Sequence, residues 1–474
     1  MPFHRTRVVV LGGGITGLTA AWELSKRFPG DVMVLEKAAA AGGLAGTFAK
    51  DKFTFDHGSH RLHDGYDPAV GALIKDLCGE DLLRRERRGC IYLNDHGIPY
   101  PPSAFHIMTA FGFRDLFRFS RDLFTSRVRH WTVQDDPLDF EAFTIGKVGR
   151  SLYERFYKPY AVKLYGMAPN ELSRDPAVHR VRKFSWGNIY RDFKKTLTRR
   201  PTYYYYPRQG IGQLSEALRQ RIARNGERLF CASTIERLRV ARDNRIHTLS
   251  FTTASQEEHT VETDLVVSTI PLDALHDAIQ WDSGERPPFG LRWRGLRLLY
   301  VITSEKLAGE SETYYFPEPV VPFGRVSELH RYSPALNSDE TRTVLTVEIP
   351  CSPGDVMWST TDEELAGQCL TALRQLGVLR GSDDGKAESF SVRLRGVYPV
   401  YDLGWQERFD RVYERLDKIE NLYVAGRSAL FLHCNIDHCM LMAINLAEHL
   451  GNPGATKDAW RPILRGFFNY RVRE

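Results

Sequence analysis

Thr6-Arg7-Val8-Val9-Val10-Leu11-Gly12-Gly13-Gly14-Ile15-Thr16-Gly17 opens with an apolar strand that leads directly into a glycine turn. Residues 18–27 have a helical pattern, and Val32-Met33-Val34-Leu35 has the composition of a second strand that ends at Glu36. Strand, glycine turn, helix, strand and acid in this order are typical of a dinucleotide-binding βαβ unit. The opening of the chain therefore predicts a bound dinucleotide.

The glycines and the acid of this unit have separate predicted tasks. Gly12 permits the tight turn, Gly14 lets backbone approach a pyrophosphate, and Gly17 lets the helix pack close to the strand. The N–H groups at the start of the helix would face the phosphates. Glu36, nineteen residues past Gly17, can accept a hydrogen bond from a ribose hydroxyl.

Length and composition place the chain among two-domain enzymes. At 474 residues it exceeds one ordinary hydrophobic core, and its net charge of +5 is too small to indicate a nucleic-acid-binding protein. Seven cysteines without a C-x-x-C pair argue against a disulfide scaffold or a metal site and fit a reducing compartment. The first strand begins too early for a signal peptide, and no apolar run approaches a transmembrane segment. We therefore expect a cytoplasmic enzyme.

Two surface features have competing interpretations. The basic clusters at residues 84–88 and 180–200 are either solvated helix faces or a rim that attracts an anionic substrate. A Phe-rich stretch over residues 105–124 has apolar residues near helical spacing, which favours packing in the protein's own core. The alternatives for that stretch are a hydrophobic substrate wall and a peripheral membrane contact.

Two further segments have the character of ligand-binding loops. Gly42-Gly43-Leu44-Ala45-Gly46-Thr47 suggests backbone that passes very close to a ligand. Phe53-Thr54-Phe55-Asp56 alternates like a strand and leads into His57-Gly58-Ser59-His60-Arg61-Leu62-His63. The remaining pattern predicts mainly helix over 68–205, a helix at 214–222, short strands over 228–270, mixed structure over 290–400, a strand at 421–424 and a closing helix at 441–450.

Over nearly the whole chain, these segments resemble a flavoprotein superfamily that includes amine oxidases, protoporphyrinogen oxidase, phytoene desaturases and UDP-galactopyranose mutase. The first glycine turn with Glu36 is similar to the ADP-binding turn of their FAD site, and residues 42–47 are similar to their second glycine motif. Residues 206–214 resemble the segment that precedes a helix in the oxidases. Gly426-Arg427 stands where the flavin-ribityl motif ends the last strand. The resemblance implies noncovalently bound FAD.

The resemblance also implies an α/β fold, in which a bipartite Rossmann-like FAD-binding domain carries an inserted α+β substrate domain. We expect residues 1–100, 205–290 and 400–474 in the FAD-binding domain. Residues 101–204 and 291–399 would form the substrate domain.

Three features are similar to the sugar mutases within this superfamily. Residues 58–63 resemble a Gly-x-His-x-x-His loop beside the isoalloxazine, and Phe156-Tyr157-Lys158-Pro159-Tyr160 through Gly166 resembles a shared substrate-domain motif. Gly426-Arg427 replaces the Gly-Asp of amine oxidases. The mutases usually have tyrosines just after that pair, whereas residues 429–434 contain none. A different activated sugar, or another substrate class, therefore stays open.

Two mechanisms stay open for the predicted site. In the first, a substrate C–H hydride passes to flavin N5 while a histidine takes a proton from the adjoining O–H or N–H. In the second, an anomeric carbon of a nucleotide sugar reacts with reduced flavin without net oxidation, and arginines bind the departing diphosphate. The leading function is thus an FAD-dependent oxidoreductase, with a redox-neutral mutase as the alternative. A third possibility is a non-catalytic scaffold stabilised by flavin.

Named residues follow from the motifs and the resemblance. The candidate catalytic residues are His60, Arg61, His63 and Arg427. The candidate cofactor-binding residues are Gly12, Gly14, Ile15, Thr16, Gly17, Glu36, Lys37, Gly43, Leu44, Gly58, Ser59, His60, Gly426, Arg427 and Asp437. The candidate substrate-binding residues are Lys158, Tyr160, Tyr205, His433 and His438. The expected partner is a small anionic or sugar-like molecule.

Structural alternatives accompany several of these residues. His60 and His63 could hydrogen-bond within a turn, and Arg61 could form an ion pair with a local acid. Asp437 could cap a helix. The tyrosines at 203–206 alternate faces if extended, which would place two of them in the core.

Overall fold

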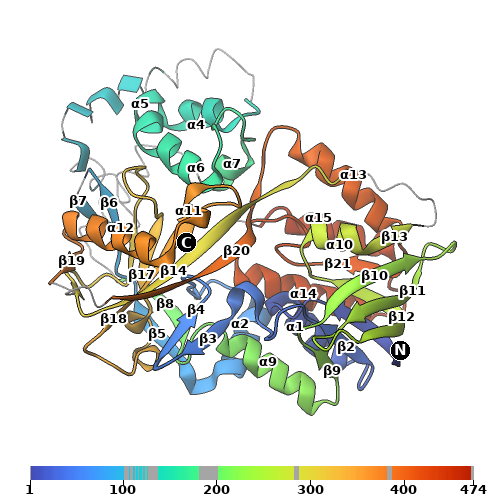
Figure 1. Cartoon of the computed structure of the whole chain (residues 1–474). Helices are drawn as coiled ribbons and strands as arrows, with labels where there is room; N and C mark the ends of the chain where they lie inside the picture. The colour runs from blue at the N-terminus through green and yellow to red at the C-terminus, as the bar shows by residue number, and fades with distance from the viewer. Residues whose placement is uncertain are drawn as a thin grey trace. The chain divides into compact units, whose positions relative to one another are not determined.

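The computed structural model describes residues 2–94, 96–100, 106, 110–112, 114–115, 117–119, 121–122, 125, 137–180, 201–281, 288–381 and 387–470. The chain forms two compact units (Figure 1). Unit 1 comprises Met1–Leu83, Tyr205–Leu291 and Gln406–Glu474. Unit 2 comprises Arg84–Tyr204 and Arg292–Trp405.

Unit 1 contains an eight-stranded sheet in the order β13-β10-β11-β12-β1-β2-β9, with β21 also paired to β12. The strands of the parallel part are β1 (Phe3–Leu11), β2 (Val32–Leu35), β9 (Arg228–Phe230), β12 (Glu258–Ser268) and β21 (Leu422–Val424). Residues 8–11 have no exposed side-chain surface, because a parallel strand of this kind is covered on both faces. The carboxyl ends of β1, β2, β12 and β21 meet at one edge of the sheet, where ligands of such folds bind.

The remaining elements of unit 1 complete the layers around this sheet. Helix α1 (Ile15–Ser25) packs against α14 (Ile436–Leu450) and α9 (Gln213–Arg224). β10 (Thr234–Val240) and β11 (Ile246–Thr252) extend the sheet in antiparallel pairing. The other elements are η1 (Gly43–Ala45), β3 (Thr47–Lys50), β4 (Phe53–Asp56), α2 (Pro68–Cys78), η2 (Gly79–Asp81), α10 (Leu272–Ala278), β13 (Ile279–Trp281), α13 (Trp405–Asp417) and α15 (Lys457–Phe467).

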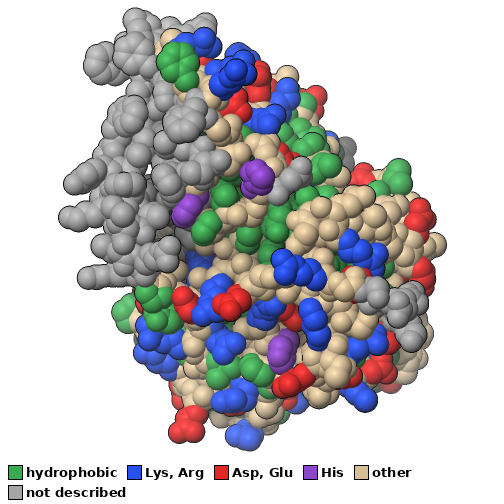
Figure 2. Space-filling view, turned by 90° about the vertical axis from the view of Figure 1, so that its left-hand side faces the viewer, with side chains coloured by type: hydrophobic (Ala, Val, Ile, Leu, Met, Phe, Trp, Pro, Cys, Tyr) green, Lys and Arg blue, Asp and Glu red, His purple; other side chains and the backbone are tan. Residues whose placement is uncertain are grey.

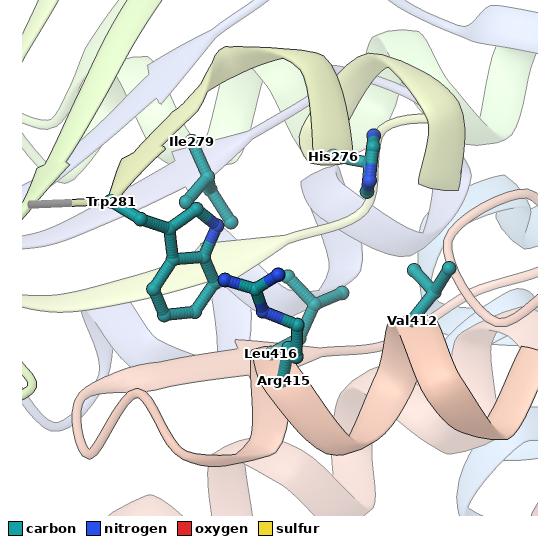
Figure 3. A pocket seen from close by; sticks show the side chains of 6 residues that line it. All are labelled: His276, Ile279, Trp281, Val412, Arg415 and Leu416. Atoms are coloured by element: carbon teal, nitrogen blue, oxygen red, sulfur yellow. The ribbon is translucent and has the colours of Figure 1, made fainter. Parts of the chain in front are cut away.

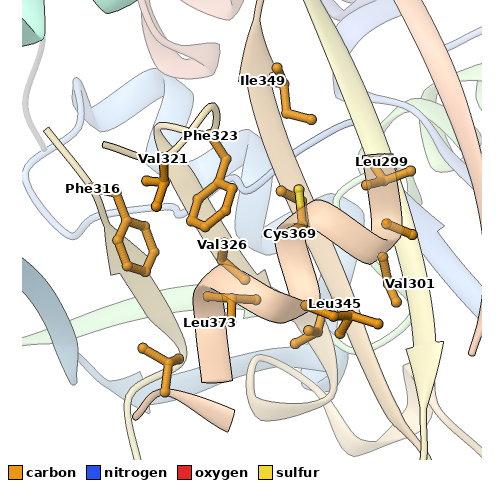
Figure 4. Packing of buried hydrophobic residues seen from close by; sticks show 14 of the residues in the cluster. Leu299, Val301, Phe316, Val321, Phe323, Val326, Leu345, Ile349, Cys369 and Leu373 are labelled. Carbon is orange, nitrogen blue, oxygen red and sulfur yellow. The ribbon is translucent and has the colours of Figure 1, made fainter. Parts of the chain in front are cut away.

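Unit 2 contains a seven-stranded sheet in the order β20-β14-β18-β17-β16-β6-β7. Its strands are β6 (Gly89–Leu93), β7 (His96–Tyr100), β14 (Arg292–Thr303), β16 (Thr313–Tyr315), β17 (Arg325–Glu328), β18 (Thr343–Pro350) and β20 (Glu388–Val400). Helix α12 (Asp362–Gln375) covers the sheet through Cys369 and Leu373, which join Leu299, Phe323 and Leu345 in a buried core (Figure 4).

Shorter elements surround this sheet. They are α4 (Phe140–Val148), α5 (Arg150–Leu152), η3 (Tyr153–Tyr157), α6 (Lys158–Tyr165), α7 (Asp175–Arg180), β15 (Lys306–Leu307), η4 (Leu329–Arg331), η5 (Pro334–Leu336), α11 (Val356–Ser359) and β19 (Leu379–Arg380). The chain passes between the two units within β5 (Leu82–Glu86) and β8 (Tyr203–Pro207).

Arg297 on β14 is a fully buried cation in unit 2. Its guanidinium donates to the carbonyl oxygens of Met357 and Thr360, each at 2.7 Å, and to Asp362. Its Nε donates to Ser391 Oγ at 3.0 Å. Through these donor groups, the arginine connects β14 to α11, to the start of α12 and to β20.

Two predictions of local structure were wrong. Residues 82–100 form strands β5, β6 and β7, not helix. In β6 the residues 89, 91 and 93 are buried, an alternation that the sequence does not show because residues 90–93 are all hydrophobic, and Pro99 is tolerated because β7 lies at the sheet edge. Unit 2 begins at Arg84 and so includes β6 and β7, whereas the prediction placed residues 1–100 in the FAD-binding domain. Helix α14 begins at Ile436 and is followed by α15, so the predicted segment 441–450 is not the closing helix.

The basic cluster at 84–88 is engaged by protein groups within unit 2. Arg85 donates to the carbonyl oxygen of Arg331 at 2.8 Å, and Arg84 lies over the ring of Tyr203 at 3.7 Å. Arg88 pairs with Glu86 at 2.9 Å. On the face shown in Figure 2, Lys and Arg side chains are interspersed with Asp and Glu. The second predicted basic cluster spans residues 180–200, and residues 181–200 lie outside the described residues.

The Phe-rich stretch is described only in part. Phe105, Met108, Leu116 and Leu123 lie outside the described residues. Phe119 packs edge to face on the buried Phe111 at 5.4 Å, in a cluster with Ile91 and Leu93. These contacts favour core packing. Within the part of the chain that the structure describes, no helix is long and apolar enough to cross a membrane.

Candidate functional site

The first glycine turn follows β1 at the carboxyl edge of the unit 1 sheet. Gly12 has φ +99°, and its N–H donates to the Leu35 carbonyl at 2.8 Å. A Cβ on Gly17 would lie 1.9 Å from the Gly12 carbonyl oxygen, so no side chain fits between helix and turn. These contacts are the ones that the motif predicts for Gly12 and Gly17.

Gly14 differs from its neighbours because nothing in the protein requires a glycine there. Its φ of −73° and ψ of 176° are accessible to every L-residue. A Cβ on Gly14 would meet no atom closer than the Cα of Gly43, at 4.0 Å. The space in front of Gly14 is therefore open at the N-terminus of α1, where backbone N–H groups favour an anion. This cradle fits a dinucleotide pyrophosphate.

The second glycine motif lies directly against the first. The Gly42 N–H donates to the Gly13 carbonyl at 2.8 Å, and a Cβ on Gly43 would stand 3.2 Å from the Gly14 Cα. The close backbone approach predicted for residues 42–47 is thus made to the glycine turn itself. His57 Nδ1 lies 2.9 Å from the Gly43 carbonyl, which connects this motif to the histidine loop.

Glu36 holds the turn with both carboxylate oxygens. One accepts from the Gly13 N–H at 2.6 Å, and the other accepts from the Ala38 N–H at 2.7 Å. Each carboxylate oxygen has more than one acceptor position, so the predicted contact with a ribose hydroxyl is compatible with both bonds. Lys37 is exposed beside it.

A buried carboxylate anchors the strand that leads into the histidine loop. Asp56 ends β4 with no exposed surface, and it accepts from Thr47 Oγ1 at 2.5 Å, from the Tyr206 hydroxyl and from the Ile211 N–H at 3.2 Å. Burial raises the pKa of Asp56 to about 6, although the three donors act in the opposite direction. Tyr204 and Tyr206 are both buried, as the predicted alternation of β8 requires.

The loop from Gly58 to His63 is fixed at its centre by the backbone of Tyr205. The Leu62 N–H donates to the Tyr205 carbonyl at 3.0 Å, and the Tyr205 N–H donates back at 2.6 Å. Leu62 is buried, whereas His60 and Arg61 are partly exposed. Gly58, with φ +91°, and Ser59 are buried. The structure thus brings the predicted substrate residue Tyr205 beside the predicted catalytic loop.

His63 is directed at Asp437. Its Nε2 lies 3.5 Å from the Asp437 carboxylate, while its Nδ1 accepts from the Gly65 N–H at 3.2 Å. The His63 N–H donates to the Tyr66 hydroxyl at 2.7 Å, and the two rings lie 4.1 Å apart. Both ring nitrogens of His63 therefore face protein groups, which fixes the orientation of the ring.

Asp437 and His438 lie in the first turn of α14, and the helix N-cap is Asn435. The alternative that Asp437 caps the helix was therefore wrong. His438 Nδ1 accepts from the Asn435 N–H at 3.3 Å, and its Nε2 lies 3.6 Å from Asp437. Burial alone would raise the pKa of Asp437, but the contact with His63 and the charges of both histidines hold that pKa below its usual value. Asp437 thus remains ionised between two imidazoles.

The Gly426-Arg427 pair begins a tight loop after β21. Gly426 has φ +105°, and a Cβ there would lie 2.8 Å from Thr16 Oγ1. Arg427 Nη1 donates to the Cys434 carbonyl at 2.5 Å, which closes the loop. Phe431 is fully buried with φ +52°, a strained conformation for an aromatic residue. His433 is partly buried in this loop.

Most predicted site residues lie in unit 1, and two do not. Lys158 and Tyr160 belong to α6 of unit 2, where the Tyr160 ring stacks on Phe156 at 6.4 Å. Sequence reasoning missed four residues around His63 and α14: Tyr66, Cys434, Cys439 and Tyr470. The C-x4-C spacing of the two cysteines was visible in the sequence, whereas the stacking of Tyr470 on His438 had no local signal.

Small hollows elsewhere do not share these residues. One of about 220 Å³ is lined by His276, Trp281 and Arg415, whose guanidinium lies 4.8 Å from the Trp281 ring (Figure 3). Its lining includes no residue of the glycine motifs or the histidine loop. It lacks the converging polar groups of a substrate site.

The glycine cradle, the acid after β2 and the loop after β21 define a dinucleotide-binding enzyme whose cofactor unit is assembled from separated segments. The chain belongs to the family of flavin containing amine oxidoreductases, whose model matches residues 15–450. This family consists of flavin-containing oxidoreductases, and the chain has the Rossmann-like architecture of FAD-binding proteins, so the predicted family, fold class and cofactor are confirmed.

Known proteins similar to this chain share its fold more than its sequence. The crystal structure of reduced UDP-galactopyranose mutase has a TM-score of 0.79 at 18% identity, covering 99% of this chain and 100% of that one. A putative protoporphyrinogen oxidase from Exiguobacterium sp. 255-15 has a TM-score of 0.69 at 19% identity, covering 94% and 98%. Coproporphyrinogen III oxidase of Propionibacterium freudenreichii subsp. freudenreichii is 29% identical over 188 residues, which are 37% of this chain. The chain thus matches about a third, 34%, of the length of that relative.

Proposed function

We propose that this oxidoreductase removes a hydride from a small polar substrate of the sugar or nucleotide-sugar class. The observation that carries the proposal is the histidine loop, which is fixed to β8 and to α14 in the unit that contains the glycine cradle. FAD, when bound, supplies the hydride acceptor. The glycine turn, Glu36 and the Gly426-Arg427 pair would hold it.

The histidine loop supplies the acid–base group. The substrate hydroxyl must lose a proton when its carbon loses a hydride, and an imidazole near neutral pKa can accept that proton. The ring nitrogens of His63 are directed at Gly65 and Asp437, so His63 is suited to hold the loop. We therefore assign a positioning role to His63, and we propose His60, the other histidine of the Gly-x-His-x-x-His loop, as the proton acceptor.

Variants of the two histidines test this division. His60→Ala should retain FAD and lose turnover by about a hundredfold or more, the usual contribution of a general base. His63→Ala should retain FAD and alter turnover less, and its pH profile should keep the wild-type form. Unchanged turnover in His60→Ala would remove His60 from the mechanism.

The substrate class is tested by the visible spectrum of the anaerobic holoprotein during addition of a panel of nucleotide sugars. Bleaching of the oxidised flavin band by one compound is expected, and it would identify the substrate class. Bleaching by an amine or a porphyrinogen instead would contradict the sugar proposal.

A redox-neutral mutase is the second candidate. It is supported by the fold likeness to UDP-galactopyranose mutase and by the Gly-x-His-x-x-His loop. In this reading Arg61 and Arg427 would bind the diphosphate of the substrate. The absence of tyrosine from residues 429–434 favours a sugar nucleotide other than UDP-galactose. This candidate requires turnover only after prior reduction of the flavin, so equal turnover with oxidised flavin would exclude it.

A further inference from the structure

Two cysteines meet at the start of α14. Cys434 Sγ and Cys439 Sγ lie 3.7 Å apart, and both residues are buried, at 4% and 5% exposure. Cys434 precedes the N-cap Asn435, and the Cys439 N–H donates the first helical bond to the Asn435 carbonyl at 3.1 Å. Because Cys434 stands outside the helix, its side chain can turn back to a cysteine five positions later. The helix start thus creates a buried pair of thiols.

The surroundings of this pair favour a thiolate on one sulfur. Cys439 accepts hydrogen bonds from the Cys434 thiol, from Thr16 and from the backbone N–H of Arg427. These donors lower the pKa of the Cys439 thiol against the opposing effect of burial. The same hydrogen bond and burial raise the pKa of Cys434. A cysteine with a lowered pKa beside a second thiol is the arrangement of a nucleophile and its resolving partner.

The pair also adjoins residues of the candidate FAD site. Thr16 lies in the first turn of α1, between Gly14 and Gly17 of the glycine motif, and a Cβ on Gly426 would lie 2.8 Å from its hydroxyl oxygen. Arg427 follows that glycine and closes the loop on Cys434. Since both sulfurs are shielded from solvent, a dissolved oxidant has poor access to them. The redox partner that the site itself supplies is FAD.

We propose that Cys434 and Cys439 form a dithiol/disulfide couple that exchanges two electrons with the bound FAD. In the oxidising direction two S–H bonds break and one S–S bond forms. Two electrons and two protons pass to FAD, which is thereby reduced. The sulfurs must approach from 3.7 Å to about 2.05 Å for the bond to form. This inference rests on bound FAD and is independent of the substrate.

A reductive titration of the holoprotein tests the couple without any substrate. After air equilibration and removal of oxygen, the wild-type protein should take up about four electrons per FAD, two for the flavin and two for the disulfide. Cys434→Ser and Cys439→Ser should each take up about two. Cys90→Ser, a half-buried cysteine of β6 in unit 2, is the matched control and should behave as wild type.

Alkylation of the wild-type protein gives a second readout that needs no variant. Iodoacetamide added on denaturation of the air-equilibrated holoprotein should label five of the seven cysteines, and all seven after reduction. A peptide in which Cys434 and Cys439 are joined should appear only in the air-equilibrated sample. Labelling of all seven in that sample, or an uptake of about two electrons per FAD by wild type, would overturn the proposal.

Discussion

Gly14→Ala separates folding from cofactor binding, because the two make different demands on this position. The backbone angles at Gly14 suit alanine, and the new Cβ would have no neighbour closer than 4.0 Å. The apoprotein should therefore lose only about 1 kcal/mol or less, the usual difference between glycine and alanine at an N-cap. The pyrophosphate of FAD, in contrast, should clash with the new methyl group.

The expected loss of affinity follows from the size of that methyl group. A Cβ stands about 1.5 Å from its Cα, so a phosphate oxygen in contact with glycine must withdraw by a comparable distance. N–H···O bonds weaken steeply beyond about 3.2 Å, and each one made to a charged group contributes about 1.5–3 kcal/mol. Loss of two such bonds amounts to about 3–6 kcal/mol, which corresponds to a Kd raised by about 10²–10⁴-fold.

The assay compares thermal unfolding of the apoproteins with fluorescence titration of FAD. Gly17→Ala is the folding-defective counterpart, since its Cβ would lie 1.9 Å from the Gly12 carbonyl oxygen. Gly71→Ala in α2 meets nothing within 4 Å and should be neutral or stabilising by up to about 1 kcal/mol. Wild-type FAD affinity in Gly14→Ala would show that the open cradle does not receive the pyrophosphate. An apoprotein destabilised as strongly as Gly17→Ala would show that Gly14 is structural.

Three further predictions concern stability and the histidine loop. Arg297→Met should lower the free energy of unfolding by about 3–5 kcal/mol, because it leaves Asp362 and two carbonyl oxygens without their buried donor. Denaturant unfolding measures this free energy, and a loss below about 1 kcal/mol would contradict the prediction. The raised pKa of Asp56, about 6, means that the native state favours its protonated form, so wild type should gain up to about 3 kcal/mol relative to Asp56→Asn as pH falls from 7 to 4. A difference that shrinks as pH falls would refute that sign. Tyr66→Phe should cost about 1–3 kcal/mol by removing the acceptor of the His63 N–H, and wild-type stability would mean that another group replaces it.

The sequence was most informative where structure is local. Gly12 and Gly17 are required by contacts within one strand–turn–helix unit, so a short motif was enough to predict them. The contact of His63 with Asp437 joins residues 374 positions apart, and no local pattern could reveal it. The sequence predicted His63 as a catalytic residue and Asp437 as a cofactor-binding residue, with no contact between them. Their contact, and the resulting preference for His60 as the base, required the fold.

Two predictions were wrong: a strand was included in a long segment predicted as helix, and the last predicted helix was started at the wrong residue. The prediction of mainly helix over 68–205 missed β6, because residues 90–93 are all hydrophobic and the alternating burial of residues 89, 91 and 93 is visible only in the structure. The last predicted helix was started at residue 441, whereas α14 begins at Ile436, directly after its N-cap Asn435. The same displacement concealed the cysteine pair, since Cys434 and Cys439 meet only when the helix begins between them.

The order in which the cofactor unit can form is set by the sequence positions of its strands. β1, β12 and β21 pair side by side although they begin at residues 3, 258 and 422. Closure of such long chain segments slows folding, and a ribosome must release the chain through residue 424 before β21 can join the sheet. The glycine turn is therefore synthesised long before the Gly426 loop that completes the cradle. We therefore expect FAD to be captured only after β21 has been synthesised, and a chain that stops before β21 should fail to retain it.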